Sequence, residues 1–167
     1  MKETGEEGTT LFEEVQQFTR PSVSRFFKVL TGIVFLALLV SLIIQKGRFT
    51  DYNKLLIVLL PILLVLNIIF ASRLVTQIRT DGLYVRFPPW QSRFSVYDWI
   101  DIAEIQVREY QPMREFMGWG IRYGIRKMGY IVAASFCIEI VLKNGYTVIV
   151  TTQRVEEVNE VLKRIEI

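Results

Sequence analysis

The chain has 167 residues, of which 20 are basic and 17 acidic, for a formal net charge of +3. The charges are interspersed rather than gathered into a basic patch, which argues against a nucleic-acid-binding protein. The sequence contains no histidine and one cysteine, Cys137. This composition excludes an internal disulfide and a multi-thiolate metal site, and it removes the commonest general base. We therefore expect no metal, no cofactor and no enzymatic activity.

Residues 1–25 are predicted to form a polar N-terminus with a short amphipathic helix. The first residues are acidic rather than basic, unlike a secretory signal. Thr10 and Glu13 have the spacing of a capping box, and the apolar residues at 11, 12, 15 and 18 would share one face of a helix ended by Pro21. Two locations stay open for this helix: the membrane interface and the surface of the soluble domain.

Two uncharged apolar runs, residues 29–44 and 55–70, dominate the first half of the chain. Sixteen residues rise about 24 Å as a helix, and flanking apolar residues bring each run near the roughly 30 Å of a hydrocarbon core. A short polar connector separates the runs. The pattern predicts a two-helix transmembrane hairpin over residues 26–73. The alternative is a buried helical pair in a soluble core, although such helices usually keep a polar stripe.

Basic residues suggest how the hairpin is oriented. Five stand on its terminal side, at positions 20, 25, 28, 73 and 79, against three in the connector, at 46, 48 and 54. This excess places both termini in the cytoplasm, with two spans in the inner cell membrane. Within the second run, Asn67 is expected to hydrogen-bond across to Ser41 or Thr31. A functional role for Asn67 in a pathway is the alternative.

From residue 74 onward the apolar pattern alternates. Asp81-Gly82 and Asn144-Gly145 are two hairpin turn signals, and the second predicts that Ile140 pairs with Ile149. About seven short strands are predicted, followed by an amphipathic helix over residues 155–165 that Thr151 or Thr152 would cap. The predicted fold class is a membrane α-helical hairpin plus a soluble α+β domain over residues 74–167. In that domain, a seven-strand, partly open β-barrel or sandwich is capped by the C-terminal helix.

Four motifs between residues 74 and 165 carry a family resemblance. They are Asp81-Gly82-Leu83, Trp99-x-x-Ile102-x-x-Ile105, Gly118-Trp119-Gly120-Ile121-Arg122, and Asn144-Gly145 ahead of Val150-Thr151-Thr152-Gln153. Together with the two-helix anchor, this order resembles the bacterial pleckstrin-homology-like (PH-like) membrane proteins. The resemblance implies a PH-like fold and a membrane-tethered binding or scaffolding function.

Residues 118–130 are the most unusual soluble segment, because four glycines alternate with aromatic and basic residues. Arginine beside aromatic rings suits an anionic headgroup or a membrane surface. The structural alternative is that the glycines allow a bent strand and Trp119 fills the core. The candidate binding residues are Trp119, Arg122, Tyr123, Arg126, Lys127 and Tyr130.

Two other groups invite a catalytic interpretation. The carboxylates of Asp98, Asp101, Glu104 and Glu109 are scattered over a strand and a turn, which is typical of a solvated edge. Cys137 lacks a histidine that would activate it, and it is expected to be a small half-buried strand residue.

The sequence therefore predicts a membrane-anchored, noncatalytic PH-like module that binds a protein partner or an anionic lipid at the cytoplasmic face of the membrane. The alternative is a self-assembling structural protein or an accessory subunit of a larger membrane complex. Gly32, Ala37 and Ser41 would then form a helix-packing face. The expected partners are the lipid bilayer, anionic headgroups, and a protein or second copy, and no nucleic acid.

Overall fold

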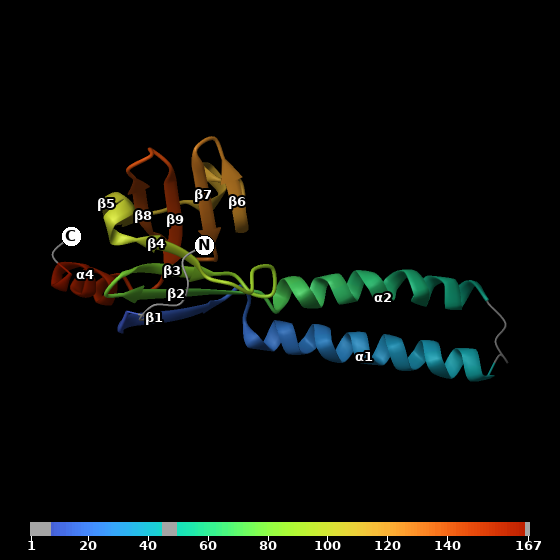
Figure 1. The fold of residues 1–167 in the computed structure, drawn as a ribbon. Helices are drawn as coiled ribbons and strands as arrows, with labels where there is room; N and C mark the ends of the chain where they lie inside the picture. Colours follow the sequence, from blue (N-terminus) through green and yellow to red (C-terminus); the bar gives the residue numbers. More distant parts are fainter. Residues whose placement is uncertain (1–7, 45–49, 166–167) are drawn as a thin grey trace. The chain divides into compact units, whose positions relative to one another are not determined.

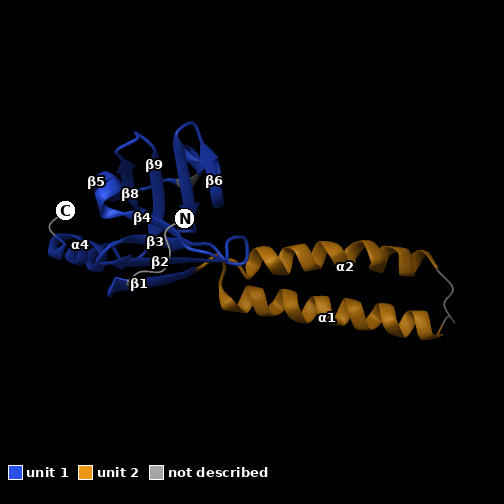
Figure 2. Cartoon of the chain, in the orientation of Figure 1, with its two compact units in different colours: residues 1–16, 73–167 blue, residues 17–72 orange. Residues whose placement is uncertain are grey.

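A computed structural model gives the fold of the chain and describes residues 8–44 and 50–165 (Figure 1). The chain divides into two compact units (Figure 2). Unit 1 comprises residues 1–16 and 73–167, and unit 2 comprises residues 17–72. Within the described residues, unit 2 consists of two long helices, whereas unit 1 contains the strands and the C-terminal helix.

The helices of unit 2 are α1 (Pro21–Ile44) and α2 (Asp51–Phe70). Both are long and apolar enough to span a membrane by length and composition. Only 11% and 17% of the residues in their most apolar windows are buried. So little burial does not fit a helical pair inside a soluble core, whose apolar residues would be covered by protein. The predicted pair of apolar helices is confirmed. Most of its connector, residues 45–49, lies outside the described residues.

Polar contacts join the two helices at two levels. The Asn67 side-chain amide donates to the Thr31 hydroxyl at 2.6 Å, which confirms one of its two predicted partners. The Ser41 hydroxyl instead donates to the Asn53 side-chain oxygen at 2.6 Å. An apolar contact layer that includes Leu38 lies between the helices as well. Polar pairs of this kind fix the relative register of two packed apolar helices.

The N-terminal segment is a strand, so the predicted amphipathic helix is wrong. Strand β1 (Thr10–Gln17) alternates exposed and buried side chains, with Phe12, Glu14 and Gln16 buried. Two of these three are polar, so the sequence shows no alternating hydrophobicity. Their partners come from the far end of the chain: Glu14 accepts from the Thr152 hydroxyl at 2.7 Å, and Gln16 donates to a carbonyl in the same segment at 2.6 Å.

The strands of unit 1 form two sheets. The first has the order β1-β2-β3-β4, and the second has the order β5-β8-β9-β7-β6. The remaining strands of the first sheet are β2 (Arg73–Arg79), β3 (Gly82–Arg86) and β4 (Ser95–Asp98). Those of the second are β5 (Ile102–Glu109), β6 (Gly120–Gly124), β7 (Lys127–Ile131), β8 (Phe136–Leu142) and β9 (Thr147–Thr152). Short helices η1 (Trp99–Asp101) and α3 (Pro112–Glu115) precede and follow β5, and α4 (Val155–Arg164) ends the fold.

This architecture confirms an α+β domain with a C-terminal helix and corrects the predicted strand count. The described residues form sheets of four and five strands and no closed barrel. One extra strand is β1, which the sequence pattern assigns to a helix. Residues 120–124 and 127–131 form the β6–β7 hairpin, in which β7 also pairs parallel to β9.

Unit 2 is an excursion from the first sheet, because β1 and β2 are hydrogen-bonded neighbours although residues 18–72 separate them. Only residues 18–20 connect β1 to α1, and only residues 71–72 connect α2 to β2. Both ends of the hairpin therefore enter the same sheet. If the hairpin crosses a membrane, β1 and the rest of unit 1 must lie on the same side of it.

Both predicted turns differ from the prediction in which residues occupy the loop. Gly82 begins β3 rather than occupying the turn, and a Cβ there would lie 2.5 Å from the Tyr97 carbonyl oxygen. In the β8–β9 turn, Gly145 has a φ of 76° and the Leu142 N–H donates to the Tyr146 carbonyl. A three-residue loop with a left-handed last residue results. Ile140 therefore pairs with Val148, one position from the predicted partner.

The core of unit 1 combines apolar faces of both sheets with the stripe of α4. Leu83 and Ile138 are fully buried strand residues, and Val158 and Leu162 are the most buried residues of the helix. The predicted stripe is thus confirmed, but the predicted threonine cap is wrong. Arg154 occupies the N-cap position without a side-chain cap, since the Thr152 hydroxyl bonds to the Arg154 N–H and to β1.

Candidate functional site

The β6–β7 hairpin becomes more exposed from its base to its turn. At the base, Ile131 is fully buried. At the other end, Gly124 pairs with Lys127 and leaves Ile125 and Arg126 as a two-residue turn. Ile125 is 94% exposed, the highest value among the large apolar residues described, and Tyr123 is 74% exposed. We call Tyr123, Ile125, Arg126 and Lys127 the tip surface.

The structure separates the six predicted binding residues. Tyr123, Arg126 and Lys127 lie together at the tip. Trp119 precedes β6 at the base of the hairpin and is 45% exposed, so it does not fill the core. Tyr130 is fully buried, and its hydroxyl donates to the Ser95 hydroxyl of the other sheet at 2.9 Å. Tyr130 therefore joins the two sheets and is not available to a partner.

The basic side chains of the hairpin bond to backbone carbonyls. Arg122 donates to the Trp119 carbonyl at 2.9 Å, and Arg126 to the Asn144 carbonyl at 2.8 Å. The Lys127 ammonium reaches the Glu115 carbonyl at 3.4 Å and lies over the Phe116 ring. Within the described part of the chain, none of the three cations has a carboxylate as an ion-pair partner.

Along the sequence, the charged residues of this segment have one sign. From residue 116 to residue 138 the sequence contains three basic residues and no acidic one. The Arg126 backbone carbonyl also accepts from the Thr147 N–H, so the tip is fixed beside the β8–β9 turn. The tip surface thus combines exposed apolar groups with two cations that form no ion pair within the described residues.

The glycines of this segment have a structural role as well. Gly118 and Gly120 have φ values of 148° and 92°, which favour glycine on entry to β6. A Cβ at Gly118 would lie 2.8 Å from the Arg122 guanidinium, so this glycine also makes room for that side chain. The structural interpretation therefore accounts for the glycines, but it does not account for the exposed tip.

Compared with models of protein families, with curated proteins and with solved structures, the chain matches none. The site therefore has to be interpreted from its own geometry.

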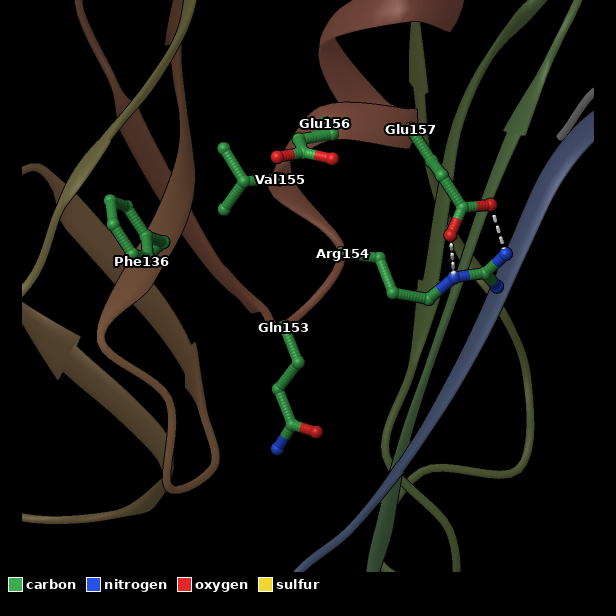
Figure 3. A pocket seen from close by; sticks show the side chains of 6 residues that line it. All are labelled: Phe136, Gln153, Arg154, Val155, Glu156 and Glu157. Carbon is green, nitrogen blue, oxygen red and sulfur yellow. Dashed lines mark hydrogen bonds and ion pairs between the residues drawn. The ribbon is translucent and has the colours of Figure 1, made fainter.

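Ile125 and a shallow pocket are not among the features predicted from the sequence. The pocket, of about 500 Å³, lies where β9 leads into α4 and is lined by Phe136, Gln153, Arg154, Val155, Glu156 and Glu157 (Figure 3). Arg154 and Glu157 turn toward each other and form an ion pair, whereas Val155 points toward Phe136. The ion pair joins Arg154 to Glu157, which leaves Glu156 as the one other charged residue of the lining. An isoleucine in a two-residue turn is the sequence signal for the tip.

The groups considered for catalysis are dispersed or inert. Within residues 8–44 and 50–165, no three acidic or thiol side chains gather as a metal site would require. Asp101, Glu104 and Glu109 are exposed, as expected of a solvated edge, whereas Asp98 is half-buried. Cys137 is fully buried rather than half-buried, and this burial raises the pKa of its thiol to about 12. A thiol in this state is neutral and unreactive at physiological pH.

Proposed function

We propose that this chain is a membrane-anchored, noncatalytic PH-like module that binds an anionic lipid or a protein partner at the cytoplasmic face of the membrane. In this proposal α1 and α2 cross the bilayer, and the β6–β7 hairpin provides the interaction surface. The observation that carries the proposal is the tip surface. Tyr123 and Ile125 are exposed there beside Arg126 and Lys127, which form no ion pair with any carboxylate in the part of the chain that the structure describes.

The order of elements supports the PH-like part of the proposal. Eight strands follow the two apolar helices, and α4 follows the last of them, as the resemblance implies for strands and a C-terminal helix behind a two-helix anchor. Strand β1, which precedes α1, departs from that order. The β6–β7 hairpin lies at one edge of the second sheet, where an exposed surface can vary without disturbing the core.

The membrane part of the proposal rests on the exposed apolar faces of α1 and α2. Residues such as Ile33, Leu36 and Val58 are about 60% exposed within unit 2. Lipid would cover side chains that water would otherwise have to solvate. The short connections to β1 and β2 would keep unit 1 near the membrane and raise its local concentration there.

A photo-crosslinking amino acid in place of Tyr123, in the full chain and in intact cells, tests the binding function. We expect lipid or protein adducts that decrease when Arg122, Arg126 and Lys127 are changed together to Ala. The control places the same crosslinker at Glu160, an exposed residue of α4. Equal adduct yields at the two positions would contradict the proposal.

Self-assembly, or membership of a larger complex, is the second candidate. One observation favours it: Gly32 leaves open space on α1, where an added Cβ would meet nothing within 4 Å. Two other residues of the predicted packing face are already used inside the hairpin, because Ser41 bonds to Asn53 and Ala37 packs against the apolar layer. The mass of the detergent-solubilised protein separates the two candidates, since a monomer favours the module.

A further inference from the structure

We infer that the tip surface is a second membrane contact, which docks on a bilayer containing anionic lipid. The inference rests on the proposed function and selects one of its two partners. Tyr123 and Ile125 would enter the headgroup region, and Arg126 and Lys127 would contact lipid phosphates.

The shape of the tip favours a lipid surface. Tyr123 and Ile125 are the most exposed parts of the hairpin, and Ile125 is almost as accessible as in an extended chain. They lie at the end of the hairpin, whereas the binding of a partner strand would need an apolar row along the edge of β6. Trp119, which is 45% exposed, stands at the opposite end of β6, near the exposed Met117. An aromatic and an aliphatic side chain on one tight turn form a small projection suited to the headgroup region.

The charge of the tip favours an anionic surface. Arg126 and Lys127 follow the exposed isoleucine directly, and residues 116–138 contain no acidic residue. Each cation near an anionic bilayer surface strengthens binding by about 5-fold. The pair therefore contributes about 25-fold, a factor that requires anionic lipid and decreases with salt.

The tip is also held in a fixed conformation. Arg126 adopts a φ of 54°, its guanidinium donates to the Asn144 carbonyl, and its own carbonyl accepts from the Thr147 N–H. The Lys127 ammonium is held by the Glu115 carbonyl and the Phe116 ring. Docking would therefore order few further groups, which reduces its entropic cost.

The test uses the full chain in nanodiscs, with a nitroxide attached at Ile125→Cys. Cys137 is fully buried and gives little background labelling. The measurement compares how strongly oxygen and a water-soluble nickel complex relax the label, in discs with 30% anionic lipid and in purely zwitterionic discs. In anionic discs we expect the nickel accessibility to fall several-fold. A label at Glu160→Cys on α4 should not change.

Two charge variants complete the design. Arg126→Gln with Lys127→Gln should restore nickel accessibility in anionic discs, because it removes the 25-fold factor. Lys163→Gln with Arg164→Gln changes the net charge equally on exposed positions of α4 and should have no effect. Tryptophan fluorescence melting checks that both variants fold.

Three results would overturn the inference. The first is equal nickel accessibility of the Ile125 label in both disc types, and the second is protection of the label that survives the Arg126 and Lys127 changes. The third is protection of the label only in native membranes, together with a protein adduct in the crosslinking experiment. The last would leave the proposed binding function standing with a protein as partner. A chain that fails to enter nanodiscs would instead refute the proposed membrane anchoring.

Discussion

Arg108 provides the best defined prediction for the stability of unit 1. Its guanidinium bonds to Glu115 at 2.7 and 2.9 Å, and to Glu139 at 2.8 and 3.1 Å. It thereby joins β5, β8 and α3, the helix whose Glu115 carbonyl also receives Lys127. The three side chains are 30%, 28% and 18% exposed, so the site is partly shielded from water.

Changing Arg108 to Met should destabilise unit 1 by about 2 kcal/mol. Ion pairs at the surface contribute up to about 1 kcal/mol, and breaking a buried pair costs about 3–5 kcal/mol, so this partly buried site falls between them. For a domain on the order of 100 residues, about 2 kcal/mol corresponds to a decrease in Tm of about 8–12 °C. The three tryptophans, at 90, 99 and 119, all lie in unit 1. Thermal melting of the full chain in detergent, followed by their fluorescence, therefore reports this unit.

The same variant should alter the dependence of stability on pH. Hydrogen bonds from Arg108 lower the pKa of Glu115 and of Glu139 below the ordinary value. A carboxyl group whose folded pKa is lowered stabilises the fold above its unfolded pKa of about 4.3, and this stability is lost as the pH falls through the folded pKa. The difference in Tm between wild type and Arg108→Met should therefore be largest near pH 7 and shrink below about pH 4.

Arg114 provides a matched control on the same helix. It is exposed and makes one long hydrogen bond, of 3.4 Å, to Gln111. Arg114→Met should therefore leave the Tm within about 2 °C of wild type. The reasoning is refuted if Arg108→Met melts like the control, or if its deficit is as large at pH 3 as at pH 7.

Three further predictions concern buried or crowded positions. Glu14→Ala should destabilise unit 1 by about 1–3 kcal/mol in the same melting assay, because it leaves the Thr152 hydroxyl and the Gln153 N–H without the acceptor they share. Glu13→Ala, at an exposed position, should have little effect. Cys137 should resist maleimide at pH 8 in the native protein and react after unfolding, since burial raises its pKa to about 12; rapid native labelling would show that the thiol is accessible. Gly82→Ala should lower the Tm because its Cβ would lie 2.5 Å from a carbonyl oxygen, and an unchanged Tm would mean that β4 shifts freely.

The apolar helices and α4 could be predicted because their signals are local. Two long uncharged runs define α1 and α2, and the spacing of Val158, Val161 and Leu162 defines the buried side of α4. Asn67 and Thr31 could be paired for a similar reason, since polar residues inside apolar helices have few partners to choose from.

Strand β1 could not be predicted because its stabilising contacts are not local. The side chains of Glu14 and Gln16 are buried and form hydrogen bonds with residues 151–153, which lie more than 130 positions away in the sequence. Sequence periodicity detects apolar burial and does not detect polar burial of this kind. The tip surface was only partly predicted. Composition identified Tyr123, Arg126 and Lys127, but only the register of the hairpin shows that Ile125 occupies the turn and that Tyr130 faces the core.

Labelling with a membrane-impermeant maleimide in intact cells tests the central claim most directly, namely that the α1–α2 hairpin crosses the membrane twice between neighbouring strands of one sheet. Single cysteines replace Val15 on β1, Ile100 on η1 and Tyr52 at the start of α2, all exposed side chains. We expect Tyr52→Cys to react from outside, and Val15→Cys and Ile100→Cys to react only after lysis. Reaction of all three from the same side, or of the first two from opposite sides, would contradict the account.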